Sequence, residues 1–132
     1  MGTKIVLDTS IVIALLASDE ERAPILKKIR GKTLVCSESV TPEVGNAVSA
    51  MLKRRRITRE QGVAIIDGFE RLPLSLVPYN LTRAIELCHA HNIYAYDAYV
   101  LECAERLQIP LITLDERMIE VAHALVLPLI EV

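Results

Sequence analysis

Residues 94–118 have the sequence YAYDAYVLECAERLQIPLITLDERM, and they are the most informative part of the chain. Their apolar side chains predict a helix from Ala95 to Leu107. The aliphatic run that follows predicts a strand from Leu111 to Leu114, and another helix is expected from Glu116 to Ala124. A helix, a short apolar strand and a further helix in succession are typical of a parallel sheet covered by helices.

The same alternation extends to the rest of the chain, which predicts an α/β fold with helices on both faces of a parallel sheet. Thr41 is expected to cap a helix with Pro42 in its first turn, and Thr58 to cap the next one. Gly31 and Asn92 suit helix ends. The other expected elements are strands at residues 4–7, 33–36, 74–78 and 126–130, and helices at residues 11–17, 20–30, 42–53, 59–72 and 82–91.

Composition narrows the class of protein. A chain of 132 residues corresponds to one domain, residues 1–132, with a substantial core. Its net charge of −2 means that any contact with nucleic acid must be local or mediated by metal. The three cysteines lie within apolar patterns and are expected to be reduced. Apolar runs are too short to span a bilayer, and Asp8 interrupts the N-terminal one, so we expect a soluble, cytoplasmic protein with no membrane contact.

Carboxylates occur at several junctions between strands and helices. Asp8 and Asp115 directly follow the first and fourth expected strands, and Glu43 lies in the first turn of the helix after the second strand. In parallel sheets, ligands bind beyond the carboxyl ends of the strands, so these three acids are expected at the same edge. Asp97 lies in the first helical turn before the fourth strand, and joins them only if that helix begins there.

Each acid taken singly has a simpler interpretation, as an N-cap or as a charge that favours a helix N-terminus. Taken together, crowded carboxylates repel one another, and a divalent cation relieves that repulsion. Ligands that are all oxygen select Mg²⁺ or Mn²⁺. Ser10 and Thr113 lie two positions from Asp8 and Asp115, and could hold metal-bound water. Alternatively, Ser10 bonds to the helix start and Thr113 is an ordinary strand residue.

Three segments resemble successive motifs of the PIN-domain family, in particular of VapC-type toxins. They are KIVLDTSIVIALL at residues 4–16, SVTPEVGNAV at residues 39–48, and residues 94–118. The resemblance implies a three-layer α/β/α fold with a five-stranded parallel sheet. It also implies that Asp8, Glu43, Asp97 and Asp115 form a catalytic metal site, with Ser10 and Thr113 at the positions of the family's small polar and hydroxyl residues. Relatives often have Gly where Gln108 stands.

The function that this resemblance implies is Mg²⁺- or Mn²⁺-dependent hydrolysis of RNA phosphodiester bonds, by the toxin of a type II toxin–antitoxin pair. A homodimer and a cognate VapB-type antitoxin are the implied protein partners. Basic residues that could contact RNA phosphates are Arg22, Arg54, Arg55, Arg56 and Arg117. For the triple arginine, a solvated helix end is the favoured interpretation. Tyr94, Tyr96 and Tyr99 could stack on bases, or pack between helices or across a dimer.

Two other functions stay open at this point. A PIN-like module without catalysis could bind RNA or act as a scaffold. A metal-dependent phosphatase is the second alternative, because a strand that ends in Asp can present an aspartyl nucleophile. Such phosphatases carry another Asp two residues later, where this chain has Ser10, and the chain is short for a cap domain.

Overall fold

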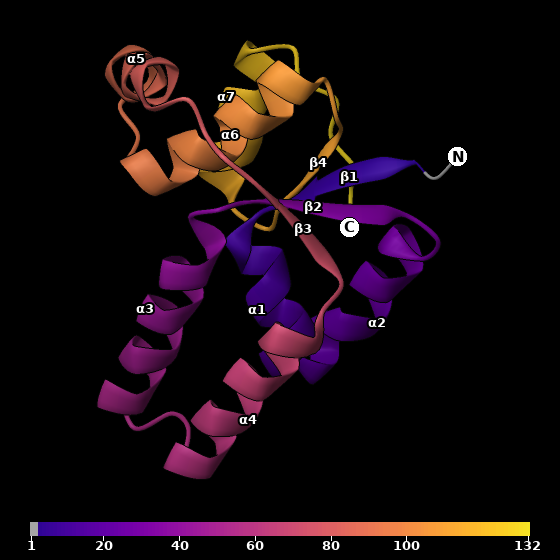
Figure 1. The fold of residues 1–132 in the computed structure, drawn as a ribbon, viewed down its shortest axis with the longest axis vertical. Helices are drawn as coiled ribbons and strands as arrows, with labels where there is room; N and C mark the ends of the chain where they lie inside the picture. The colour runs from indigo at the N-terminus through magenta and orange to yellow at the C-terminus, as the bar shows by residue number, and fades with distance from the viewer. Residues whose placement is uncertain (1–2) are drawn as a thin grey trace.

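The computed structural model describes residues 3–132, in which a parallel sheet lies between two layers of helices (Figure 1). The elements follow the alternation expected from the sequence. In chain order they are β1 (Lys4–Leu7), α1 (Thr9–Ala17), α2 (Asp19–Ile29), β2 (Thr33–Ser37), α3 (Val40–Lys53), α4 (Arg59–Arg71), β3 (Leu74–Val77), α5 (Leu81–His91), α6 (Ala95–Leu107), β4 (Leu111–Ile112) and α7 (Glu116–Ala124).

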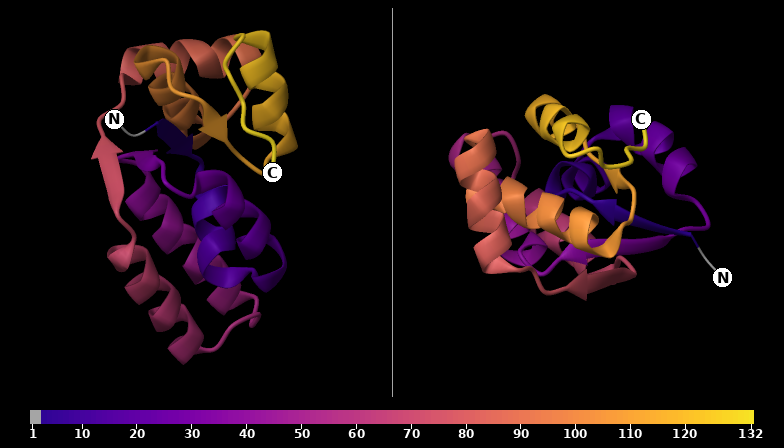
Figure 2. Two further views of the ribbon diagram at one scale, coloured as in Figure 1. Left: turned by 90° about the vertical axis from the view of Figure 1, so that its right-hand side faces the viewer. Right: turned by 90° about the horizontal axis from the view of Figure 1, so that it is seen from above.

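The sheet has the strand order β3-β2-β1-β4, with every neighbouring pair parallel. Ile5 and Leu7 of β1 face α1–α4, whereas Val6 between them faces α5–α7. Helices therefore cover both faces of the sheet, as Figures 1 and 2 show, and this explains why the buried positions of β1, β2 and β4 are mostly aliphatic. The three-layer arrangement agrees with the prediction, and it brings the carboxyl ends of β1, β2 and β4 to the same edge.

The prediction of a fifth strand at residues 126–130 is wrong, because the described residues form a sheet of four strands. This segment makes a single parallel bridge, Leu129 to Leu111, because β4 is only two residues long. Val126 has a left-handed backbone with φ 57°, and Pro128 has no N–H to donate. Leu111 N donates to Pro128 O at 3.0 Å, and Ile130 N to Leu111 O at 2.9 Å, which completes the local pairing.

Most of the expected helix ends are confirmed. Thr58 forms a capping box with Gln61, and Asn92 and Gly31 have the positive φ values of helix ends, 53° and 74°. The N-cap of α3 is an exception, because it is Ser39 and not Thr41. Pro42 still lies in the first turn of α3, where a missing N–H costs nothing.

None of the described helices has the length and apolar character needed to cross a bilayer. Cys36 and Cys103 are buried and Cys88 is half-buried, and all three are free thiols.

Candidate active site

Asp8 is the most deeply buried acid at the carboxyl edge of the sheet, with 5% of its surface exposed. Ser10 Oγ donates to Asp8 Oδ2 at 2.7 Å, and Thr113 Oγ1 donates to the same oxygen at 2.8 Å. Asp8 stands at the N-cap position of α1 but makes no capping hydrogen bond with its side chain. Its carboxylate is thus fixed by two hydroxyls, and capping does not explain its presence.

The same two hydroxyls shape the segment that leads to Asp115. Leu114 N donates to Ser10 Oγ at 3.1 Å, and Asp115 N donates to Thr113 Oγ1 at 3.0 Å. These bonds take backbone N–H groups away from strand pairing, which explains why β4 ends at Ile112. Asp115 Oδ1 in turn accepts from Met118 N at 3.0 Å and caps α7. The capping interpretation therefore holds for one oxygen of Asp115.

Glu43 lies in the first turn of α3 and is supported by two serines that the sequence analysis missed. Ser39 Oγ donates to Glu43 Oε2 at 2.9 Å, and Ser39 Oγ lies 2.9 Å from Ser37 Oγ. Ser37 and Ser39 are both buried. The available signal was a pair of serines, two residues apart, where an aliphatic strand ends.

Asp97 lies in the first turn of α6, near the other acids. The pKa of Asp97 is raised to about 6. Burial is the largest cause, and the charges of Asp8 and Asp115 contribute to the same rise. Asp97 therefore lies near both of them. The sequence left the direction of this helix start undecided, and the packing of α6 against β1 and β2 determines it.

The same crowding affects the carboxyls of the buried Asp8 and the half-buried Glu43. Burial raises the pKa of Asp8 above its usual range, against the hydrogen bonds from Ser10 and Thr113, and the charge of Asp115 adds to the rise. Burial also raises the pKa of Glu43 to about 7; Ser39 and Thr9 oppose this rise, whereas Asp8 and Asp97 increase it. These acids form one electrostatic group in which each ionised carboxylate disfavours the next.

The oxygen donors suit a hard divalent cation, although they are not a preassembled cage. Across residues 3–132, no three His, Cys, Asp or Glu side chains lie close enough to form a ready-made ligand cluster. Mg²⁺ retains several water molecules and needs only one or two carboxylates in contact, so separated carboxylates are compatible with it. Thr9 Oγ1 is near enough to Glu43 to lower the pKa of that carboxyl, yet it is buried and makes no hydrogen bond of normal geometry with a described residue.

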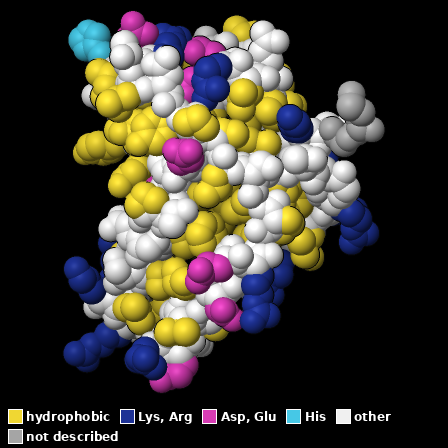
Figure 3. All heavy atoms as spheres, viewed as in Figure 1, with side chains coloured by type: hydrophobic (Ala, Val, Ile, Leu, Met, Phe, Trp, Pro, Cys, Tyr) yellow, Lys and Arg dark blue, Asp and Glu magenta, His cyan; other side chains and the backbone are white. Residues whose placement is uncertain are grey.

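The arginines proposed for RNA contact do not lie together. Arg54, Arg55 and Arg56 follow the far end of α3, which at 1.5 Å per residue places Arg54 about 16 Å from Glu43 along the helix. Figure 3 shows basic side chains around this end of the molecule. Arg22 pairs with Asp19 at 2.9 Å, and Arg117 pairs with Glu120 at 3.0 Å. Phosphate contacts by these residues stay a prediction.

The fold and the acids invite comparison with known proteins. Residues 5–124 match the family model of the PIN domain. The chain belongs to the PIN-domain family. This PIN-domain protein is 32% identical over 116 residues to Ribonuclease VapC12 of Mycobacterium tuberculosis, which covers 86% of this chain and 88% of that relative. It therefore groups with the VapC-type members of the family, as the sequence motifs indicated.

Solved structures agree with the PIN fold. The crystal structure of PAE2754 from Pyrobaculum aerophilum superposes with a TM-score of 0.72 at 19% identity, over 90% of this chain and 79% of that one. The crystal structure of VapBC2 from Rickettsia felis, bound to a DNA fragment from the promoter, gives a TM-score of 0.69 at 17% identity, over 97% and 98% of the two chains. At these identities the likeness concerns the fold alone.

Proposed function

We propose that this PIN-domain protein is an endoribonuclease that uses Mg²⁺ or Mn²⁺ to hydrolyse phosphodiester bonds of RNA. The observation that supports the proposal most strongly is the electrostatic group of Asp8, Glu43, Asp97 and Asp115, in which the charge of Asp115 raises the pKa values of Asp8 and Asp97, and the charges of Asp8 and Asp97 raise that of Glu43. Such a group favours a bound cation, because a cation removes the mutual repulsion. The name of the relative Ribonuclease VapC12 supports RNA as the substrate.

Asp8, Glu43, Asp97 and Asp115 are the residues proposed to hold the ion. A bound divalent ion supplies positive charge near the scissile phosphate and lowers the pKa of a coordinated water. The hydroxyls of Ser10 and Thr113 keep Asp8 Oδ2 in place, so Asp8 need not reorganise during the reaction. Ser39 in the same way holds Glu43 Oε2, which leaves Glu43 Oε1 free to accept a proton.

The biological role proposed is that of the toxin in a type II toxin–antitoxin pair, with a VapB-type antitoxin as partner and a homodimer as the working assembly. The support is the kinship with VapC12 and the fold shared with the VapBC2 structure. If expression of this chain arrests growth, co-expression of a short reading frame found next to its gene should restore growth.

The cleavage assay uses single-stranded RNA with the purified protein, first in EDTA and then with Mg²⁺ or Mn²⁺ in excess. We expect no cutting in EDTA, cutting after addition of either ion, and none by Asp8→Asn. Asp67→Asn is the matched control, because Asp67 is an exposed acid on α4 that pairs with Arg71. Cutting that persists in EDTA, or in Asp8→Asn, contradicts the proposal.

Further measurements on the same samples distinguish the two alternative functions, a phosphatase and a non-catalytic RNA-binding module. Turnover of a small phosphomonoester without RNA cleavage would favour the phosphatase. RNA binding without any cleavage in Mg²⁺ or Mn²⁺ would favour the non-catalytic module. Asp8→Asn should unfold at the same temperature as the wild type or slightly higher, because it removes a buried charge from a crowded group.

A further inference from the structure

A hollow of about 610 Å³ opens between the start of α3, the loop from β3 to α5, and the start of α6. Its walls include all four tyrosines of the chain, Tyr79, Tyr94, Tyr96 and Tyr99, together with Glu38 and Ser39. Figure 3 shows hydrophobic side chains gathered on this side of the molecule, near the level of α5. This is the volume and the mixture of aromatic and polar lining that small-molecule sites have.

The tyrosines divide into a packed pair and an open pair. The rings of Tyr79 and Tyr99 stack with centroids 3.9 Å apart, and Tyr96 meets Tyr99 edge to face at 6.0 Å. Tyr94 is 87% exposed and Tyr96 is 45% exposed. Tyr94 and Tyr96 therefore expose aromatic surface beside the stacked pair. Exposed rings of this size gain stability when a ligand covers them.

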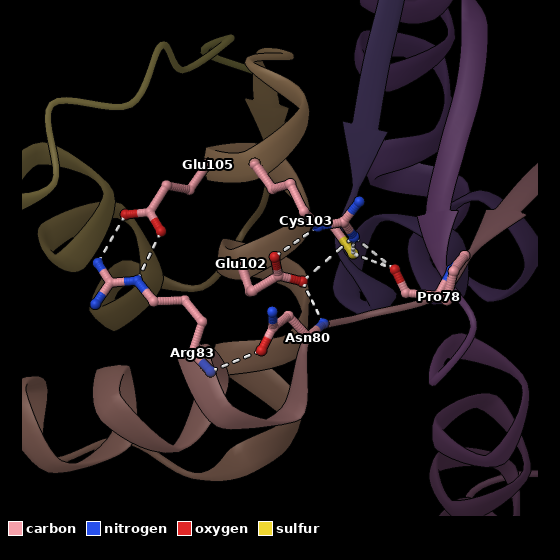
Figure 4. A network of polar contacts seen from close by, with 7 residues as sticks. Pro78, Asn80, Arg83, Glu102, Cys103 and Glu105 are labelled. Carbon is pink, nitrogen blue, oxygen red and sulfur yellow. Dashed lines mark hydrogen bonds and ion pairs between the residues drawn. The ribbon is translucent and has the colours of Figure 1, made fainter.

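The backbone on either side of Tyr79 is bonded to an ion pair between the buried Glu102 and the exposed Arg106; Figure 4 shows Glu102 with the neighbouring Pro78 and Asn80. Glu102 on α6 is 1% exposed, and its carboxylate accepts from Asn80 N at 2.8 Å and from Arg106 Nε at 2.8 Å. Arg106 also donates to Pro78 O at 2.6 Å. These hydrogen bonds hold the backbone at Pro78 and Asn80, on both sides of Tyr79. The loop between β3 and α5 is therefore ordered without a ligand.

Two residues of the hollow adjoin the proposed metal site. Ser39 lines the hollow and donates to Glu43 Oε2 at 2.9 Å, while Tyr96 immediately precedes Asp97 in α6. Glu38 stands in the hollow as an exposed acid, and its carboxylate makes no hydrogen bond or ion pair within residues 3–132. A ligand that fills the hollow therefore lies near Glu43 and Asp97, and the carboxylate of Glu38 is available to accept hydrogen bonds from it.

We propose that this hollow binds one unpaired nucleobase of the RNA substrate, stacked on Tyr94 and Tyr96, and that Glu38 selects a base with an amino group. The inference rests on the proposed ribonuclease function. Stacking on aromatic rings accepts any base, whereas a carboxylate accepts hydrogen bonds only from donors. Guanine offers an N1–H and an amino group side by side to the carboxylate, and uracil has no amino group. The base anchors the strand so that an adjacent phosphate lies over the acids.

The test uses the full chain in EDTA and a short single-stranded RNA that carries one 2-aminopurine, whose fluorescence falls when the base stacks. We expect saturable quenching by the wild type and by Tyr94→Phe. Tyr94→Ala should bind about 5- to 100-fold more weakly, as expected for loss of one base-stacking ring. Because Tyr94 is 87% exposed, the Ala variant should keep its melting temperature. Equal affinity for wild type and Tyr94→Ala overturns the proposal.

Unlabelled RNAs with guanine or uracil at the same position then compete with the probe. The wild type should prefer guanine by about tenfold, and Glu38→Gln should lose most of that preference without losing the quenching. Equal competition by both RNAs against the wild type contradicts the role of Glu38.

Sedimentation of the wild type and of Tyr94→Ala tests whether the hollow is instead an interface between two copies of the chain. A dimer that the substitution dissociates would assign the hollow to a second copy and overturn base binding.

The cleavage assay keeps the two proposals distinct. Metal-dependent cutting that Tyr94→Ala leaves unchanged in rate and KM would reject the base site and retain the ribonuclease. Quenching that depends on Tyr94, in a protein that cuts no RNA, would support the base site and reject the proposed activity. A rise in KM for Tyr94→Ala with little change in kcat supports both.

Discussion

Replacement of Glu43 by Gln should stabilise the protein above neutral pH in the absence of metal. The pKa of Glu43 rises from 4.5 to about 7 on folding, chiefly because the carboxyl is buried. Between these two values the folded protein binds more protons than the unfolded chain, so the free energy of unfolding falls as pH rises through this window. Glu43→Gln removes the titration and keeps an oxygen that accepts from Ser39 Oγ.

The size of the effect follows from the same rise in pKa. At a pH where Glu43 is ionised in both states, the rise corresponds to about 3 kcal/mol, and solvent screening of a partly exposed side chain reduces this to about 1–2 kcal/mol. For a chain of this length, that is an increase of about 3–8 °C in Tm. The difference between variant and wild type should be largest above pH 7 and vanish near pH 4.5.

Thermal unfolding in EDTA, followed by circular dichroism from pH 4.5 to 8.5, measures this difference. Glu70→Gln is the matched control, because Glu70 is an exposed acid of α4 outside the acidic group. It should change Tm little at any pH in the series. A Glu43→Gln protein that is no more stable than the wild type at pH 8, or whose advantage is as large at pH 4.5, would refute the account of crowding.

Two further predictions concern stability and are measured by urea unfolding at pH 7. Gln108 has φ 55° after α6, so Gln108→Gly should raise the free energy of unfolding by about 0.5–1 kcal/mol, whereas Gln108→Ala should not. A Gly variant no more stable than the Ala variant would contradict this. Glu102→Gln places an amide beside Arg106 and should lower the free energy of unfolding by about 1–3 kcal/mol. Wild-type stability in Glu102→Gln would mean that this ion pair is dispensable.

Local sequence signals located most of the elements because the physics that forms them is local. The bounds of α6, α7 and β1 agree with the ranges expected from apolar spacing. The capping box at Thr58 and the left-handed Asn92 depend only on neighbouring residues. The positions of Asp8, Glu43 and Asp115 at one edge follow from the rule that parallel strands end together.

Features that depend on contacts between distant residues could not be predicted from the sequence. Residues 126–130 have a strand-like composition, yet the short β4 offers them a single bridging partner at Leu111. The direction of Asp97 depends on how α6 packs on the sheet. The hollow lined by tyrosines combines Glu38, Tyr79 and Tyr99 from three separate segments, and no periodicity in the sequence relates them.

Direct titration with Mn²⁺ is the measurement that tests the central proposal most closely. Isothermal titration calorimetry at pH 7.5 should show saturable binding to the wild type, with affinity reduced at least tenfold in Asp8→Asn and in Asp97→Asn. Both variants should remain folded, and Asp67→Asn should bind Mn²⁺ as the wild type does. Unchanged Mn²⁺ affinity after both aspartates are replaced together would contradict the proposal that these carboxylates form the metal site.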